Sequence, residues 1–124
     1  MAVKRQNSVR VAVLGIGSLG QHHARIYAEM AAAGAVTFAG VFDSKPDTAR
    51  SYAEKFGTRA FHSIEEAAGA SDALNIVTPT TSHYSIAKTL LERGKHLLIE
   101  KPMTDDMTQA GELVELARRN NCLI

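Results

Sequence analysis

Short apolar runs alternate with longer amphipathic stretches along almost the whole chain. Runs rich in Val, Ile and Leu predict strands buried on both faces, whereas apolar residues three and four positions apart predict helices. The expected strands cover residues 9–14, 35–42, 58–62, 73–78, 95–100 and 122–124. The expected helices cover residues 18–33, 44–56, 63–69 and 82–94, with a last helix that begins near Thr104.

This alternation of strands and helices indicates an α/β fold. Helical connections between successive strands imply parallel pairing through right-handed crossovers. We therefore expect a doubly wound parallel sheet covered by helices on both faces, which makes three layers, α/β/α. The expected strand order is 3-2-1-4-5-6, and residues 58–62 have the weakest strand pattern.

Several helix ends carry start and stop signals. Glycine closes three of the expected helices, at Gly34, Gly57 and Gly94. Ser63 and Glu66 have the spacing of a capping box, in which each side chain binds a backbone N–H of the other residue.

The last two helices carry distinct apolar stripes. Thr104 is expected to cap the last helix, with Asp105 and Asp106 in its first turn, where the helix dipole favours anions. The stripe of helix 82–94 consists of Ile86, Ala87, Leu90 and Leu91. The stripe of the last helix consists of Met107, Ala110, Leu113, Val114 and Ala117.

Composition narrows the class of protein. The 124 residues suit one domain, and 45% hydrophobic with 22% charged residues is typical of a globular fold. A net charge of +1 argues against a nucleic-acid or anionic-membrane partner. No apolar run approaches the roughly 20 residues that span a bilayer. The basic residues 1–7 lead through Arg10 into the first expected strand, so we do not interpret this start as a signal peptide.

The single cysteine, Cys122, cannot form a disulfide within the chain. It fits a reducing compartment, and we expect a cytoplasmic location. Cys and His residues show no spacing typical of a metal site, so no metal is expected.

A glycine-rich turn follows the first expected strand. Gly15, Gly17 and Gly20 form the pattern G-x-G-x-x-G, with Ser18 and Leu19 before the third glycine. Gly15 permits a tight turn, Gly17 lets a pyrophosphate approach the backbone, and Gly20 lets the helix pack closely on the strand. The helix N-terminus offers unpaired N–H groups to the phosphates. Its position between a strand and a helix favours a dinucleotide site over a turn without a ligand.

Asp43 lies at the end of the second expected strand, 23 residues after Gly20. A carboxylate there can accept hydrogen bonds from the adenosine ribose hydroxyls, and it repels a 2′-phosphate, which favours NAD over NADP. Lys45 or Arg50 could instead pair with that phosphate, so NADP stays possible. Asp43 could also only cap a helix, and some methyltransferases place an acid here too.

The fifth expected strand ends in charges, in the segment "IEKPM" at 99–103. Strand ends on this edge of a doubly wound sheet face the cofactor crevice. Lys101 there could stabilise an oxyanion or assist proton transfer, and Pro102 would fix the backbone after it. The pair Glu100 and Lys101 could equally be ordinary surface charges.

Three segments resemble the glucose-fructose oxidoreductase and inositol dehydrogenase family (Gfo/Idh/MocA). They are "VLGIGSLGQHHARIY", "VFDSKP" and "NIVTPTTSHYSIAKTLLERGKHLLIEKPM". The resemblance covers almost the whole chain, and the pairing of T-P-x-x-x-H with E-K-P is more specific than the glycine pattern. It implies a Rossmann fold that binds NAD or NADP.

The resemblance also implies roles for individual residues. Family members line the nicotinamide half of the cofactor with the loop that matches Thr78, Pro79 and His83. The family glutamate that matches Glu100 lies near the nicotinamide ribose. The lysine that matches Lys101 orients the substrate and assists proton transfer. His83 could instead be a packed ring.

Family members continue into a second domain, usually with an Asp-x-x-x-His pair, which supplies most of the substrate pocket and the oligomer interface. The resemblance therefore implies that residues 1–124 are only a dinucleotide-binding domain, which should bind cofactor without turning over substrate. The apolar end "NNCLI" also suggests a chain cut from a longer protein, with a naturally short chain as the alternative. The whole protein would be a homo-oligomeric oxidoreductase acting on a hydroxyl of a sugar, sugar-nucleotide or cyclitol. A binding or sensing module without catalysis and a related Rossmann reductase are the alternatives; the retained E-K-P argues against the first.

Overall fold

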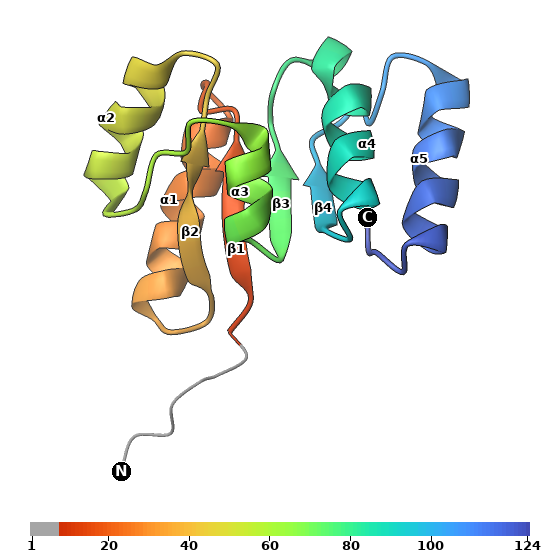
Figure 1. Ribbon diagram of the computed structural model, residues 1–124. Coiled ribbons are helices and arrows are strands. Elements are labelled where there is room, and N and C mark those ends of the chain that lie inside the picture. Colours follow the sequence, from red (N-terminus) through yellow and green to blue (C-terminus); the bar gives the residue numbers. More distant parts are fainter. Residues whose placement is uncertain (1–7) are drawn as a thin grey trace.

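The computed structural model describes residues 8–124, so the basic start at residues 1–7 lies outside the described part (Figure 1). The strands are β1 (Arg10–Leu14), β2 (Thr37–Phe42), β3 (Ala73–Ile76) and β4 (His96–Ile99). The helices are α1 (Gly20–Ala32), α2 (Pro46–Phe56), α3 (Ile64–Ala70), α4 (His83–Glu92) and α5 (Met107–Arg119), with a 3₁₀ turn η1 (Thr80–Ser82) before α4.

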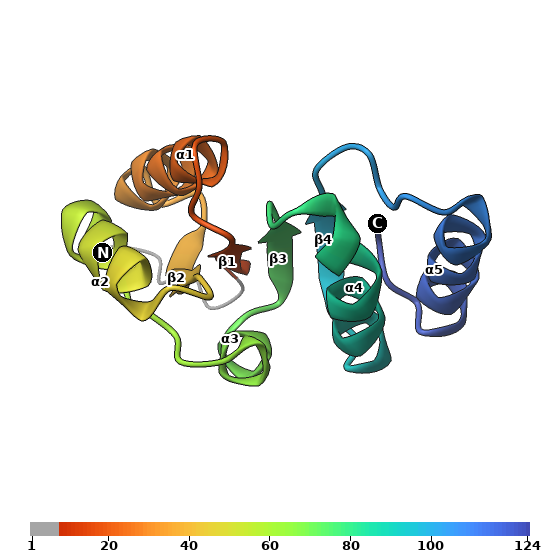
Figure 2. The same ribbon diagram turned by 90° about the horizontal axis from the view of Figure 1, so that it is seen from above.

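The four strands form one parallel sheet in the order β2-β1-β3-β4. Seen from above, α1 lies on one side of the sheet and α3 and α4 lie on the other, while α5 lies beside α4 beyond β4 (Figure 2). The expected three-layer, doubly wound fold is confirmed, because these strands have the predicted relative order.

Residues of β1 alternate between two cores, as the period of two in a strand requires. Val13 packs with Ala24 of α1 and Ala53 of α2 on one face. Ala12 and Leu14 pack on the other face with residues of α3, α4 and α5. Both faces of β1 are therefore buried, which explains its continuous apolar run.

The expected third strand, 58–62, is reduced to one bridge between Ala60 and Val41. Two backbone bonds hold it there, from Val41 N to Arg59 O and from Phe61 N to Val41 O, each 2.8 Å long. The segment lies against Gly40, where a Cβ atom would approach Arg59 O to 2.5 Å. The ladder stops at Thr58, because its N–H donates to Ala53 O at the end of α2 and its hydroxyl, not a backbone N–H, donates to Phe38 O of β2, each at 2.9 Å.

The expected strand 122–124 is absent among the described residues. Leu97 N donates to Leu123 O at 3.0 Å, while Leu123 N donates to His96 Nδ1 at 2.9 Å. A side chain thus takes the place of the next backbone partner. The segment lies at the edge of β4 but is held by a single backbone bond.

The helix-end predictions are confirmed in part. Gly34, Gly57 and Gly94 have positive φ angles of 77°, 65° and 75° after their helices. Ser63 Oγ accepts from Glu66 N at 3.0 Å, but the Glu66 carboxylate pairs with Arg59 at 2.9 Å instead of completing the box. The box therefore works in one direction only.

The predicted cap of the last helix is wrong. Asp106 caps α5, since its Oδ1 accepts from Thr108 N at 2.7 Å and from Gln109 N at 3.2 Å. Thr104 instead donates its hydroxyl to Asp106 O at 2.6 Å. A carboxylate that accepts two orphan N–H groups is the stronger cap, so the helix begins later than expected.

The apolar stripe of α4 is confirmed, because all four of its expected residues are buried. The stripe of α5 is confirmed only at Leu113 and Ala117. Met107 is 90% exposed and Val114 is also exposed, because α5 packs against α4 through a narrow face rather than against the sheet. Within residues 8–124, none of the helices has the length and apolar content to cross a membrane.

Candidate functional site

A crevice of about 890 Å³ opens where β1, β2 and β3 reach their carboxyl ends. The chain crosses from β1 to β2 on one side and later continues into β3 on the other side of β1. The carboxyl edge of these strands is therefore the switch point of the sheet. The volume lies in the range of roughly 300–1,000 Å³ found for small-molecule sites. The lining includes the glycine turn, the end of β2 and the segment after β3: residues 15–19, 42–45, 77–79, 81 and 82.

Gly15 and Gly20 are required by close packing of the backbone. Gly15 has φ 95°, and a Cβ on it would lie 2.7 Å from Val77 O. A Cβ on Gly20 would lie 1.8 Å from Gly15 O, so the start of α1 packs directly on the turn. These two glycines therefore have the structural tasks that the sequence pattern assigned to them.

Gly17 differs, because nothing in the described chain lies within 4 Å of the position of its Cβ. The amides of Gly17, Ser18 and Leu19 make no hydrogen bond within residues 8–124. The first turn of α1 holds no acidic residue. Open space, three free N–H donors and the positive end of a helix dipole together suit a bound phosphate.

Asp43 lines the crevice next to the glycine turn, and two backbone N–H groups hold its carboxylate. Its Oδ2 accepts from Ile16 N at 2.8 Å, and its Oδ1 accepts from Lys45 N at 2.9 Å. The carboxylate thus joins the turn to the end of β2 and also stabilises the turn before α2. Each oxygen retains a lone pair for a hydroxyl, so the two roles foreseen for Asp43 are compatible.

The two cations near Asp43 differ in their freedom. Lys45 is exposed and lines the crevice. Arg50 lies outside the crevice lining and pairs with Asp47 one turn earlier in α2. Of the two, Lys45 is the better placed to meet a 2′-phosphate.

The segment after β3 forms the opposite wall. Thr78 and Pro79 line the crevice as expected. The Ser82 hydroxyl lies 2.7 Å from both Thr78 Oγ1 and Pro79 O, which tightens η1. This wall is therefore short and internally bonded.

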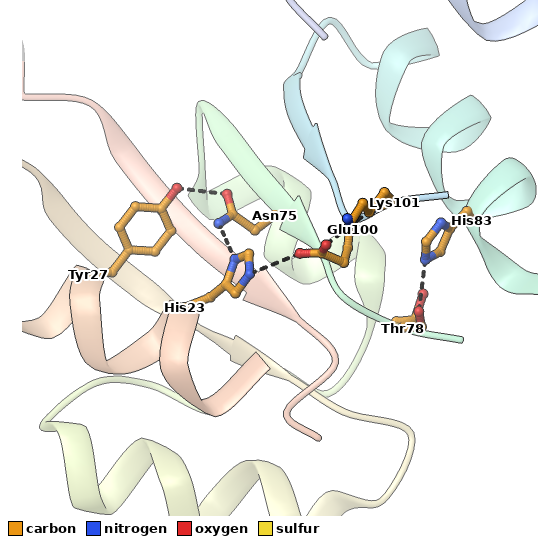
Figure 3. Close-up of polar contacts among 7 residues, drawn as sticks. All are labelled: His23, Tyr27, Asn75, Thr78, His83, Glu100 and Lys101. Carbon is orange, nitrogen blue, oxygen red and sulfur yellow. Dashed lines mark hydrogen bonds and ion pairs between the residues drawn. The ribbon is translucent and has the colours of Figure 1, made fainter. Parts of the chain in front are cut away.

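His83 was expected to face the crevice, but it is only 1% exposed and is not part of the crevice lining. Its Nε2 lies 2.8 Å from Thr78 O, and its Nδ1 lies 3.1 Å from Pro102 O and 3.2 Å from Met103 O. Figure 3 shows the ring beside Thr78, away from the cluster around Glu100. The environment matches the alternative of a packed ring that joins the segments after β3 and β4.

Glu100 and Lys101 follow β4, with Glu100 N donating to Ile76 O at 3.0 Å. Neither residue is part of the crevice lining. The Glu100 side chain is 28% exposed, and its Oε1 lies 3.3 Å from Lys101 N. The exposed Lys101 ammonium has no hydrogen bond or ion pair within the described part of the chain, so it is free to meet another molecule.

A polar chain that sequence reasoning missed leads to Glu100 (Figure 3). Tyr27 Oη lies 2.7 Å from Asn75 Oδ1, and Asn75 Nδ2 lies 2.9 Å from His23 Nδ1. His23 Nε2 lies 3.4 Å from Glu100 Oε2. Burial raises the pKa of the Tyr27 phenol, against the opposing effect of its bond to Asn75. The detectable signal was Asn75, a polar residue inside an apolar strand.

Other ionisable groups do not extend the site. His22, the neighbour of His23, is exposed. Burial raises the pKa of the Cys122 thiol, which lies away from the crevice. Within residues 8–124, His, Cys, Asp and Glu form no cluster of three that could hold a metal ion.

Residues 9–124 match the family described as "Oxidoreductase family, NAD-binding Rossmann fold" (Gfo/Idh/MocA). The UDP-N-acetylglucosamine 3-dehydrogenase of Acidithiobacillus ferrooxidans is 36% identical over 94% of this chain and 36% of its own length. The inositol 2-dehydrogenase of Corynebacterium glutamicum (strain ATCC 13032) is 36% identical over 90% of this chain and 34% of its own.

Solved structures agree with this match. The structure of the Acidithiobacillus ferrooxidans enzyme superposes with a TM-score of 0.87 over 93% of this chain and 36% of that chain. A variant of KijD10, a 3-ketoreductase from Actinomadura kijaniata in complex with TDP-benzene and NADP, is 27% identical with a TM-score of 0.82, over 94% of this chain and 36% of that chain. The chain thus spans about a third of the length of these relatives.

Proposed function

Because the chain belongs to the Gfo/Idh/MocA family of oxidoreductases, we propose that residues 1–124 are its dinucleotide-binding domain and bind NAD(H) in the crevice. The observation that carries this proposal is the open space at Gly17 together with the amides of residues 17–19, which have no partner within residues 8–124. In this assignment the pyrophosphate lies on residues 15–20 and the adenosine ribose on Asp43. The nicotinamide half extends along Thr78 and Pro79 toward Glu100.

We assign NAD as the preferred cofactor, with NADP as the weaker ligand. The Asp43 carboxylate is fixed by two backbone N–H groups, so it cannot easily turn away from a 2′-phosphate. Lys45 offers the compensating charge and gives NADP its residual affinity. The complex of the KijD10 variant with NADP supports NADP as the second possible ligand.

For the whole protein we propose hydride transfer between nicotinamide and a carbon that carries a hydroxyl, in a sugar, sugar-nucleotide or cyclitol. The named activities of the relatives support these substrate classes. The bound nicotinamide would accept or deliver the hydride. Lys101 would touch the reacting hydroxyl, where its charge stabilises developing oxyanion character and helps move the hydroxyl proton.

In the same proposal His83 holds two segments in place rather than acting on substrate. A further domain would complete the substrate pocket and form the interface of a homo-oligomer. A cytoplasmic location fits the single cysteine.

The experiment is a titration of the 124-residue chain with NADH, NADPH and ADP-ribose, followed by calorimetry. We expect saturable binding of NADH and ADP-ribose and weaker binding of NADPH. Asp43→Asn is the matched variant, because it keeps the shape and removes the charge; it should narrow the preference for NADH over NADPH. A chain that binds none of the three ligands would overturn the proposal.

A further inference from the structure

Four side chains from separate parts of the fold form one continuous line of polar contacts, with two hydrogen bonds and a final ion-pair contact. Tyr27 and His23 stand one turn apart on α1, Asn75 is central in β3, and Glu100 follows β4. Asn75 is only 4% exposed. Figure 3 shows the line running from the α1 side of the sheet to the point where Lys101 begins.

The chemistry of Asn75 sets the direction of the protons along this line. Its amide nitrogen faces His23 Nδ1 at 2.9 Å, and an amide N–H can only donate. His23 Nδ1 must therefore accept, which leaves the ring proton on Nε2. That proton faces Glu100 Oε2 at 3.4 Å.

The Tyr27 end agrees with this direction. A protonated phenol donates to Asn75 Oδ1 at 2.7 Å, although a phenol can also accept from a reversed amide. In the reversed amide, the neutral ring would carry its proton on Nδ1 and would present a lone pair to the Glu100 carboxylate. The Tyr27 end is compatible with this arrangement, and the Glu100 end is the one that favours it.

Burying an amide inside an apolar strand is costly unless its hydrogen bonds are made. Asn75 has both an acceptor and a donor bond, so the cost is offset only while Tyr27 and His23 keep their positions. The line ends at the half-buried Glu100 carboxylate, which also accepts from the backbone N–H of Lys101 at 3.3 Å.

Resting on the function proposed above, we propose that His23, held by Asn75 and Tyr27, is a positioning residue that aims the Glu100 carboxylate at the nicotinamide half of the cofactor. His23 Nε2 lies 3.4 Å from one oxygen of Glu100, and the other oxygen accepts from Lys101 N at 3.3 Å. The line therefore fixes the rotamer of Glu100 and the start of the segment that carries Lys101. The adenosine half, on Asp43, lies outside its reach.

The test compares two ligands of the 124-residue chain, NADH and ADP-ribose, which lacks nicotinamide. His23→Leu removes the polar contact to the Glu100 carboxylate, so it should weaken NADH binding roughly tenfold and leave ADP-ribose affinity unchanged. His23→Gln should restore NADH binding, because its amide can accept from Asn75 and donate to Glu100. His22→Leu, the same change one residue earlier on the exposed side, should alter neither affinity.

A second readout does not depend on binding. In a two-bond ¹H–¹⁵N correlation spectrum of the ¹⁵N-histidine-labelled chain, the signal lost in His23→Gln should show a proton on Nε2 and none on Nδ1. A ring protonated on Nδ1 alone would overturn the proposal.

The remaining outcomes are also decisive. If His23→Leu weakened the binding of NADH and ADP-ribose equally, His23 would be only a packing residue. The same would follow if His23→Leu and His23→Gln lost equal affinity for NADH. Unchanged NADH affinity in His23→Leu would overturn the positioning role while the proposed function stands. Failure of the parent chain to bind either ligand would overturn both proposals.

Discussion

Replacing Gly17 by valine should block the proposed cofactor site without disturbing the fold. No atom of the described chain lies within 4 Å of the position of a Cβ on Gly17, and its backbone needs no left-handed conformation. The branched side chain of Gly17→Val therefore enters open space. It also occupies the space that we assign to the pyrophosphate.

The expected change in the free energy of unfolding is much smaller than the expected change in the free energy of NADH binding. The free energy of unfolding should stay within about 1 kcal/mol of the parent chain, because no contact is lost and the unfolded chain becomes less flexible. NADH binding should lose at least two hydrogen bonds from backbone N–H groups to a charged phosphate. At about 1.5 kcal/mol each, the loss is roughly 3 kcal/mol, or about a hundredfold in Kd.

The assay is a calorimetric NADH titration with a thermal unfolding curve for each variant. Gly69→Val is the matched control, since a Cβ on Gly69 of α3 also meets nothing within 4 Å but lies outside the crevice lining. Unchanged NADH affinity in Gly17→Val would refute the pyrophosphate assignment. A loss of several kcal/mol in stability would show instead that Gly17 is needed by the fold.

Three further predictions test other parts of the molecule. Asp43→Ala should weaken NADH binding by roughly 1–3 kcal/mol, and unchanged calorimetric affinity would leave Asp43 only its structural bonds to Ile16 and Lys45. Lys101→Ala should strongly reduce turnover of the full-length protein while the 124-residue chain keeps its NADH affinity; normal turnover would return Lys101 to the surface. Hydrogen bonding to Arg10 holds the pKa of Asp72 below its usual range, so this pair stabilises the fold above the usual carboxyl pKa and the contribution is lost as the pH falls through the lowered value. Because both side chains are well exposed, Asp72→Asn should lower the free energy of unfolding by less than about 1 kcal/mol at pH 7. In urea unfolding, this difference between the parent chain and the variant should disappear in acid. A difference that stays constant with pH would contradict the linkage.

Features that depend on neighbouring residues were predictable from the sequence. The strand, glycine turn and helix from β1 to α1 follow from the apolar run and the three glycines. Gly57 ends α2 in the left-handed conformation, as its place after the helix predicted. In each case the cause lies within a few residues of the effect.

Features set by distant partners were not predictable. The segment 58–62 forms a single bridge because the Thr58 N–H is bonded to the end of α2. Glu66 pairs with Arg59 instead of completing its capping box. His83 was expected at the crevice, but carbonyl groups of Thr78, 5 residues before it, and of Pro102 and Met103, 19 and 20 residues after it, enclose its ring. The line to Glu100 joins residues that only the parallel order of the sheet brings together.

The enclosed ring of His83 limits how many hydrogen bonds the two loops around it can receive. A neutral imidazole carries one N–H, yet both ring nitrogens face carbonyl oxygens, Thr78 O on one side and Pro102 O and Met103 O on the other. In that form one loop holds a hydrogen bond while the other is held by packing, and tautomer exchange moves the bond across the ring. The two loops thus share a single bond, so strengthening the hold on one releases the other.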